Sequence, residues 1–377
     1  MDIQTNFRPT KAVIDLQAIK YNITSLQNHL QKDVQIIAVV KANAYGHGAL
    51  EVAKAAIQAG ATMLAVATPD EAVYIRAHLK EIDILVLGAV PLNFIPFASE
   101  ENITLTVFSV EWMQQANDYL PQDNPVKVHI KIDSGMGRIG VVTKEELLTL
   151  YEAIEATAHF VVDGIFTHFA TADEEDSVYF EKQVALFKEL LNALPTKPRL
   201  VHVANTATAL VKETSLQFDA VRFGISMYGL VPSAYVGQVL PFPIKPAFTL
   251  QTELVHVKQL KAGQSVGYGA TYTATTDCYI GTIPIGYADG MIRKLSGQEV
   301  LIGGERAKIV GRICMDQSMI LLPKAYTIGE QVVLIGKQQQ DEITIDHWAN
   351  KLQTINYEVP CIITARVPRV YSCTSSI

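Results

Sequence analysis

The sequence predicts an α/β protein in which an N-terminal (β/α)8 TIM barrel is followed by a mainly β-strand C-terminal domain. Eight short apolar runs alternate with amphipathic segments over the first two-thirds of the chain. Three prolines then occur within Pro241–Pro246, and β-rich stretches separated by turn residues follow. The length of 377 residues allows two domains, and 49% hydrophobic against 18% charged residues excludes intrinsic disorder.

The apolar runs are expected to form the barrel strands. They are continuous rather than alternating, which is typical of strands buried on both faces of a parallel sheet. A doubly wound sheet, with about six or seven strands, fits the count less well. The runs are Ile36–Val40, Met63–Val66, Ile84–Leu87, Thr104–Val107, Val126–Ile132, Val161–Phe166, Leu200–Val203 and Ala220–Phe223.

Helices are expected between these strands. Pro69 suits a first helical turn, and Thr143 suits a cap because acidic residues follow it. The expected helices are Asp15–Leu30, Leu50–Gln58, Pro69–Leu79, Val110–Tyr119, Lys144–Ala156 and Tyr179–Leu194.

The proline-rich segment separates the two expected domains, residues 1–243 and 244–377. Beyond it, period-2 or β-rich stretches predict strands, and Ile345–Leu352 is the one expected helix. The stretches are Thr249–Leu260, Cys278–Pro284, Glu299–Ile302, Arg306–Leu322 and Gln331–Ile335.

Composition excludes several classes of function. The chain has 38 acidic and 31 basic residues, so its net charge is −7, opposite to that of a typical nucleic-acid binder. No apolar run is long enough to span a membrane, and the N-terminus lacks the apolar segment of a signal peptide. Four cysteines without CxxC spacing suggest neither a zinc site nor a disulfide framework, so a cytoplasmic protein without a metal is expected.

Lys41 is the first candidate for chemistry. It directly follows an apolar strand, where partial desolvation favours the neutral amine that Schiff-base formation needs. The alternative is an exposed lysine at a strand end. The loop that follows contains Tyr45, His47 and two glycines, which suits a ligand site.

The segment Val40–Gly48 resembles the pyridoxal-phosphate attachment motif of the alanine racemase family. Further segments resemble that family in the same order through both expected domains. They are Lys131–Gly140, Thr167–Ala170, Val221–Ile225, Gly267–Thr273, Ile285–Gly290, Gly311–Gln317 and Ile355–Glu358.

The resemblance implies an isomerase that uses pyridoxal 5'-phosphate to interconvert L-alanine and D-alanine through an external aldimine, supplying D-alanine for peptidoglycan. Lys41 would bind the cofactor and serve one face of the α-carbon, and Tyr268 of the partner subunit would serve the other. Each site of the implied homodimer would therefore combine the barrel of one subunit with the β domain of the other.

The remaining roles also follow from the resemblance. Arg222 would face the pyridine nitrogen, and because arginine only donates, the ring would stay unprotonated. Arg138 and the backbone amide of Met315 would bind the substrate carboxylate, and Lys131 is a candidate for carbamylation. The other cofactor-binding candidates are Tyr45, His168, Asn205, Thr206, Gly224, Ile225 and Tyr357. All of these except His168 and Asn205 would bind the phosphate.

Alternatives remain at this stage. A racemase of the same fold with serine or broad specificity is the main rival within the enzyme class, and a decarboxylase of related fold fits less well. A non-catalytic pyridoxal-phosphate binding protein is the alternative from another class. A second domain containing Tyr268 and Met315 argues against a single-domain carrier of that kind.

Overall fold

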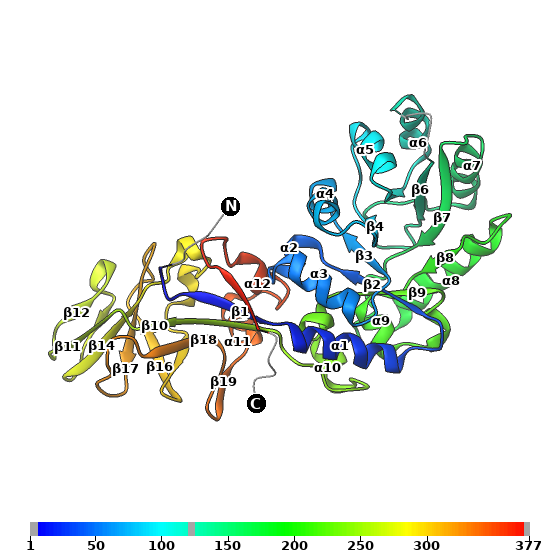
Figure 1. Cartoon of the computed structure of the whole chain (residues 1–377). Coiled ribbons are helices and arrows are strands. Elements are labelled where there is room, and N and C mark those ends of the chain that lie inside the picture. The colour runs from blue at the N-terminus through cyan, green and yellow to red at the C-terminus, as the bar shows by residue number, and fades with distance from the viewer. Residues whose placement is uncertain (1–6, 120–124, 373–377) are drawn as a thin grey trace. The chain divides into compact units, whose positions relative to one another are not determined.

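The computed structural model describes residues 7–119 and 125–372, which form two compact units (Figure 1). One unit comprises residues 18–44 and 49–245. The other comprises residues 1–17, 45–48 and 246–377. Cys373 lies outside the described residues.

The first unit is a parallel barrel, as the apolar runs predicted. Its eight strands are hydrogen-bonded in the order β8-β7-β6-β5-β4-β3-β2-β9. Two further hydrogen bonds, from Asp219 N to Val201 O (3.1 Å) and from Arg222 N to Ala204 O (2.9 Å), link the first and last strands of this order. The strands are β2 (Gln35–Val39), β3 (Met63–Val66), β4 (Asp83–Val86), β5 (Ile103–Val107), β6 (Val126–Lys131), β7 (Phe160–Phe166), β8 (Leu200–His202) and β9 (Ala220–Phe223).

Helices connect the strands and lie on the outside of the barrel (Figure 1). Capping boxes at Thr68 and Thr143 start two of them, as the sequence predicted. The expected helices correspond to α1 (Leu16–His29), α3 (Ala49–Gln58), α4 (Pro69–His78), α6 (Val110–Ala116), α7 (Lys144–Glu155) and α8 (Val178–Ala193). The short segment α2 (Lys41–Tyr45), whose backbone is left-handed, and the short helices α5 (Ile95–Glu100) and α10 (Ala234–Gln238) were not expected. No range was predicted for the short helix α9 (Thr206–Val211).

The second unit is built on a mainly antiparallel sheet, in the order β11-β14-β17-β16-β15-β18-β10-β1-β20. Its strands are β1 (Lys11–Asp15), β10 (Phe248–Glu253), β11 (His256–Leu260), β14 (Cys278–Ile283), β15 (Glu299–Ile302), β16 (Glu305–Val310), β17 (Ser318–Leu322), β18 (Gln331–Gln338) and β20 (Arg369–Ser372). Strand β19 (Asp341–Ile343) pairs with β18, and β12 (Ser265–Val266) pairs with β13 (Tyr272–Thr273). Helix α11 (Ile345–Leu352) has the predicted bounds, and α12 (Glu358–Ile362) follows it.

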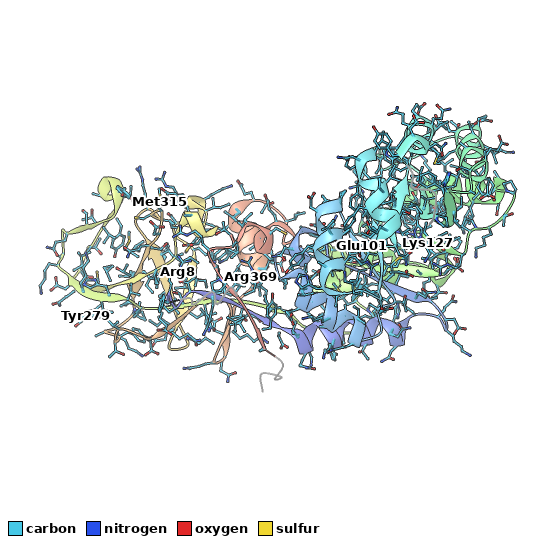
Figure 2. The ribbon with its side chains drawn as sticks, turned by 45° about the horizontal axis from the view of Figure 1, so that its top comes forward. Arg8, Glu101, Lys127, Tyr279, Met315 and Arg369 are labelled. Atoms are coloured by element: carbon cyan, nitrogen blue, oxygen red, sulfur yellow. The ribbon has the colours of Figure 1, made fainter. Side chains whose placement is uncertain are left out.

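The N-terminal segment lies in the second unit, although the sequence-based division put it with the barrel. Strand β1 pairs antiparallel with β10 and parallel with β20, and Figure 1 shows the blue β1 beside the red β20. Its alternating burial suits a strand of an antiparallel sheet. Arg8, Met315 and Arg369 all belong to this unit (Figure 2).

No helix within residues 7–119 and 125–372 is long and apolar enough to cross a membrane.

Candidate active site

Polar side chains gather at the carboxyl ends of the barrel strands, where barrel enzymes place their chemistry. Lys131 and His202 are the last residues of β6 and β8, and Arg222 lies on β9. These three side chains are buried, with exposed fractions of 2%, 0% and 4%. His168 lies two residues after β7. The structure therefore assembles four residues that are far apart in the sequence.

Arg222 is the centre of this cluster. Its Nη1 donates to the carbonyl oxygen (2.6 Å) and Nδ1 (3.0 Å) of His202. Its Nη2 donates to Thr167 O (2.8 Å), Val203 O (3.1 Å) and His168 Nδ1 (3.3 Å). Within the described part of the chain, no carboxylate is among its hydrogen-bond partners. Burial and the charge of Arg138 lower the pKa of Arg222 to about 9, so it remains a cation at neutral pH.

Burial and neighbouring cations set the charges of Lys131 and His168. Burial and then Arg222 lower the pKa of Lys131 to about 7, so a substantial share of the amine is neutral near that pH. Its Nζ donates to Ile132 O at 2.7 Å. Burial, followed by Arg222 and other cations that include Lys41, lowers the pKa of His168 well below its ordinary value. His168 is therefore a neutral imidazole.

The loop after β6 presents Arg138. Asp133 accepts hydrogen bonds from the backbone amides of Gly135 (3.0 Å), Gly137 (3.0 Å) and Arg138 (2.8 Å). Burial raises the pKa of Asp133, but these amides outweigh it and hold the pKa below its ordinary value. A Cβ atom on Gly140 would lie 2.6 Å from Asp133 N, so the loop needs glycine there. Asp133 thereby fixes the backbone of Arg138, whose side chain is exposed.

Lys41 begins a left-handed turn. Ala42, Asn43, Ala44 and Tyr45 have φ between 50° and 53°, although none is glycine. Each such residue costs about 1–2 kcal/mol, so the surroundings must hold the turn. Ala42 N donates to Glu71 Oε1 at 2.6 Å, and Asn43 Oδ1 accepts from Ala49 N at 2.8 Å. Lys41 itself is half-buried.

The barrel residues expected to bind phosphate lie on neighbouring loops. Asn205, another cofactor-binding candidate, caps α9 by accepting from Thr208 N at 3.0 Å. Thr206 Oγ1 accepts from Gly224 N at 2.9 Å, and Ile225 begins the short 3-10 helix η4 (Ile225–Tyr228). The structure thus brings Thr206 and Gly224 into contact. The first amides of such helices have no acceptor within the helix.

The two tyrosines expected at the phosphate, Tyr45 and Tyr357, both belong to the second unit. Their ring centroids lie 6.2 Å apart. Burial, with smaller contributions from Tyr357 and Cys361, raises the pKa of Tyr45 well above its ordinary value, so its hydroxyl keeps its proton.

Tyr268 and Met315 are the most exposed of the predicted site residues in the second unit. Tyr268 begins a 3-10 turn after Gly267 and is 70% exposed, and Met315 is 53% exposed. The loop that carries Met315 is held in place because Tyr287 N donates to Cys314 O and Ala288 N donates to Met315 O, both at 3.0 Å.

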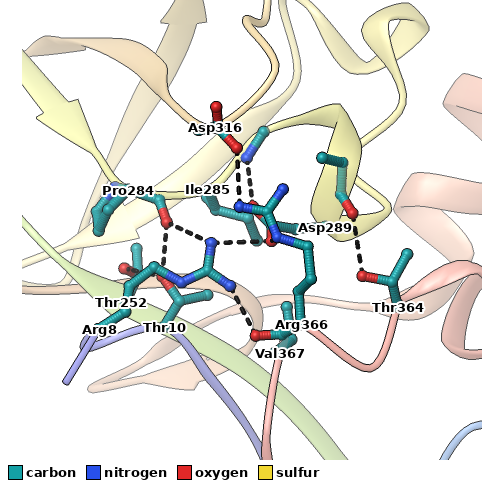
Figure 3. Close-up of polar contacts among 12 residues, drawn as sticks. Arg8, Thr10, Thr252, Pro284, Ile285, Asp289, Asp316, Thr364, Arg366 and Val367 are labelled. Atoms are coloured by element: carbon teal, nitrogen blue, oxygen red, sulfur yellow. Dashed lines mark hydrogen bonds and ion pairs between the residues drawn. The ribbon is translucent and has the colours of Figure 1, made fainter. Parts of the chain in front are cut away.

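A buried carboxylate, which no sequence pattern singled out, lies beside the loop that carries Met315. Asp289 is fully buried, and its Oδ1 accepts from Arg8 Nη1 at 2.8 Å and faces Arg366 Nε at 3.4 Å (Figure 3). Arg366 also pairs with Asp316 at 2.8 Å, next to Met315. Asp289 lies inside the segment Ile285–Gly290, but its spacing gave no sign of partners at both ends of the chain.

Polar and charged side chains at the carboxyl ends of the strands of a parallel barrel are typical of the barrel enzymes as a class. The positive charge of Arg222 and Arg138 favours the binding of an anionic small molecule. Residues 14–232 match the family described as "Alanine racemase, N-terminal domain", and residues 247–371 match "Alanine racemase, C-terminal domain". The chain belongs to the alanine racemase family.

Individual relatives agree with this assignment. The chain is 51% identical, over 98% of its length and 97% of the relative's, to an alanine racemase of Anoxybacillus flavithermus. A crystal structure of alanine racemase from E. faecalis is 45% identical, with a TM-score of 0.94 over 97% of this chain and 98% of that one. A histidine racemase from Leuconostoc mesenteroides is 33% identical, with a TM-score of 0.91 over 98% and 99% of the two chains.

Proposed function

We propose that this protein is an alanine racemase that uses pyridoxal 5'-phosphate to interconvert L-alanine and D-alanine, and so supplies D-alanine for peptidoglycan. The observation that carries the proposal is the placement of Lys41 two residues after the end of β2, close enough to the buried Arg222–His168 cluster for its charge to lower the pKa of His168. Full-length relatives named as alanine racemases support the choice of substrate.

The side chains of the barrel fit an anionic cofactor. Arg222 and Arg138 supply positive charge, while His168 is neutral and Lys131 is partly neutral, so the cluster has an excess of donors. Lys41 would bind the cofactor aldehyde, and the hydroxyl and amide groups would hold the phosphate. Those groups are Tyr45, Thr206, Gly224, Ile225 and Tyr357, and Asn205 is a further cofactor-binding candidate. When bound, pyridoxal phosphate withdraws electrons from the substrate α-carbon.

Arg222 would donate to the pyridine nitrogen and leave it unprotonated. Its other donors are already committed to carbonyl oxygens and imidazole nitrogens, which orients the guanidinium. A weaker electron sink favours return of the proton to the α-carbon over transamination. The variant Arg222→Glu should therefore release more keto acid from alanine, and no rise would count against this role.

Two bases would move the α-proton. The Lys41 amine would take or return it on one face, and the Tyr268 hydroxyl of the partner subunit would act on the other. Exposure of Tyr268 and Met315 supports a homodimer with composite sites, because the same unit also exposes Tyr287, Ile292 and Ile355 by 41–62%. Arg138 and the Met315 amide would hold the substrate carboxylate.

Lys131 is the candidate for carbamylation. Its partly neutral amine can attack carbon dioxide, and the product loses a proton to leave an anionic carbamate. That anion would balance Arg222 and Arg138. Solution NMR with ¹³C-labelled bicarbonate should show one carbamate that is missing in Lys131→Met.

Reduction and turnover assays test the whole proposal. Borohydride should abolish the visible band of the bound cofactor and attach it to Lys41, as peptide mass mapping would show. Racemisation of alanine should then exceed that of serine and histidine. Histidine belongs in the assay because of the similar structure that is named a histidine racemase. Cofactor binding without any racemisation would favour the non-catalytic alternative.

A further inference from the structure

A row of hydrogen-bonded side chains extends from Arg222 through the barrel to Arg199. His202 Nδ1 lies 3.0 Å from Arg222 Nη1, and His202 Nε2 lies 2.8 Å from His129 Nδ1. His129 Nε2 lies 3.2 Å from Asp163 Oδ2. Arg199 forms two bonds of 2.7 Å to the Asp163 carboxylate. We name these five residues the barrel relay.

The donor at one end of the barrel relay sets the direction of every bond. Arginine has no acceptor, so Arg222 donates and Nδ1 of His202 must be without a proton. A neutral His202 then has its proton on Nε2 and donates to Nδ1 of His129. His129 in turn has its proton on Nε2 and donates to Asp163. The far end of the relay therefore needs a group that only accepts, and the Asp163 carboxylate is such a group.

The opposite direction is incompatible with Arg222. A proton on Nδ1 of His129 would force the proton of His202 onto Nδ1, where it would oppose an Arg222 donor at 3.0 Å. Burial is the main cause that lowers the pKa of both histidines, which are fully buried. Asp163 acts to raise the pKa of His129, but burial outweighs it, and Arg199, which pairs with Asp163, also lowers that pKa.

The surroundings of the barrel relay are shaped to hold its rings. A Cβ atom on Gly164 would lie 2.7 Å from three atoms of the His129 ring, so only glycine leaves room for this histidine. The His202 ring stacks on Phe166 with centroids 4.8 Å apart and planes at 12°. Arg222 lies over the same Phe166 ring at 5.5 Å. The ring planes, and hence the directions of their nitrogens, are fixed by packing.

We propose that Asp163 and His129 are positioning residues, which act through His202 to fix the direction and charge of Arg222 without touching cofactor or substrate. This inference rests on the proposed function, in which Arg222 faces the cofactor ring. Because two neutral imidazoles separate Arg222 from the carboxylate, the relay orients the guanidinium while leaving its positive charge uncompensated. A carboxylate in direct contact would compensate that charge.

The direct test is the position of the imidazole protons. Selective ¹⁵N labelling of the nine histidines, with assignment by single substitutions, reports the protonated nitrogen in the holoenzyme. We expect His129 and His202 to be neutral, with protons on Nε2, through the pH range in which exposed histidines titrate. A proton on Nδ1 of either ring, or titration of either ring in that range, would overturn the inference.

Substitutions test the effect on Arg222. His129→Gln keeps one acceptor and one donor, whereas His129→Leu interrupts the relay. Asp163→Asn allows the reversed direction. A small misplacement of a positioned group lowers the reaction rate strongly. We therefore expect His129→Leu and Asp163→Asn to lower kcat on the order of tenfold to a hundredfold with little change in KM. His129→Gln should restore most of kcat.

A matched control separates positioning from general damage. Asp219→Asn removes the charge of another barrel carboxylate, which lies outside the relay, pairs with Lys197 at 3.2 Å and accepts from Val201 N at 2.8 Å. Because the amide oxygen of asparagine can still accept from Val201 N, this variant should leave kcat near wild type. The absorbance band of the bound cofactor should shift in Asp163→Asn and stay in place in Asp219→Asn. Equal effects of the two would overturn the inference. If Asp163→Asn shifts the band but the wild-type protein racemises no amino acid, the relay stands and the proposed reaction is wrong.

Discussion

The Nε atom of Arg369 donates a hydrogen bond of 2.9 Å to the carbonyl oxygen of Gly46, across 323 residues of sequence. The same guanidinium donates to Ile363 O (2.6 Å), Thr364 O (2.7 Å) and Val367 O (2.8 Å). Arg369 therefore holds the segment that follows the Lys41 turn against the C-terminal part of the second unit. A Cβ atom on Gly46 would lie 2.1 Å from Pro360 O, which shows how closely this segment is docked.

Removing this guanidinium should destabilise the protein. Arg369→Met leaves four carbonyl oxygens without their donor, and we expect the free energy of unfolding to fall by about 3 kcal/mol. Urea unfolding followed by circular dichroism measures it. Arg306→Met is the control, because Arg306 pairs with Asp341 and Glu299 at the surface and should contribute under about 1 kcal/mol. Equal losses in the two variants would contradict the role given to Arg369.

Mixing two inactive variants tests the composite site. Lys41→Ala and Tyr268→Phe should each lack racemase activity as a homodimer. A mixed dimer has one site with both native residues and one with neither, so activity should reappear after the subunits exchange. An assay before and after joint unfolding and refolding measures this recovery. If both bases came from one chain, no activity would return.

The buried Lys131 predicts a specific dependence of stability on pH. Its pKa in the folded protein is lowered from 10.5 to about 7, so the unfolded chain binds more protons between these values. The free energy of unfolding should therefore rise with pH across this window. Below it, Lys131 is protonated in both the folded and the unfolded state and adds no pH dependence. In buffers free of carbon dioxide, unfolding of the wild type relative to Lys131→Met should follow this curve. A constant difference between the two proteins would contradict the lowered pKa.

The left-handed turn predicts an unusual effect of glycine. Ala42 is exposed and has φ of 52°, so Ala42→Gly relieves steric strain and should leave the free energy of unfolding unchanged or raise it by up to about 1 kcal/mol. The same substitution at Ala153, inside α7, should lower it by about 1 kcal/mol. Denaturant titration of both variants distinguishes the two sites. A similar loss at both positions would mean that the turn is not strained.

Local patterns were sufficient for much of this architecture. Continuous apolar runs predicted the eight parallel strands, because strands buried on both faces need no polar alternation. The runs Val126–Ile132 and Ala220–Phe223 contain Lys131 and Arg222, so both residues were expected on the barrel. Strand β1 was missed because Lys11–Asp15 is only 5 residues long and its partners lie more than 230 residues away.

The amino-acid sequence by itself determined the barrel, the β-rich second domain and the family, since each depends on periodicity or on contiguous motifs. Only the tertiary structure decided where the N-terminal segment pairs, that four non-glycine residues after Lys41 turn left-handed, and that His129 and Asp163 extend the bonds of Arg222. These features depend on contacts between residues distant in sequence. The residues next to a histidine in the sequence do not show whether its ring only fills space in the core or donates a hydrogen bond to a buried carboxylate. Its position in the folded structure distinguishes these two roles.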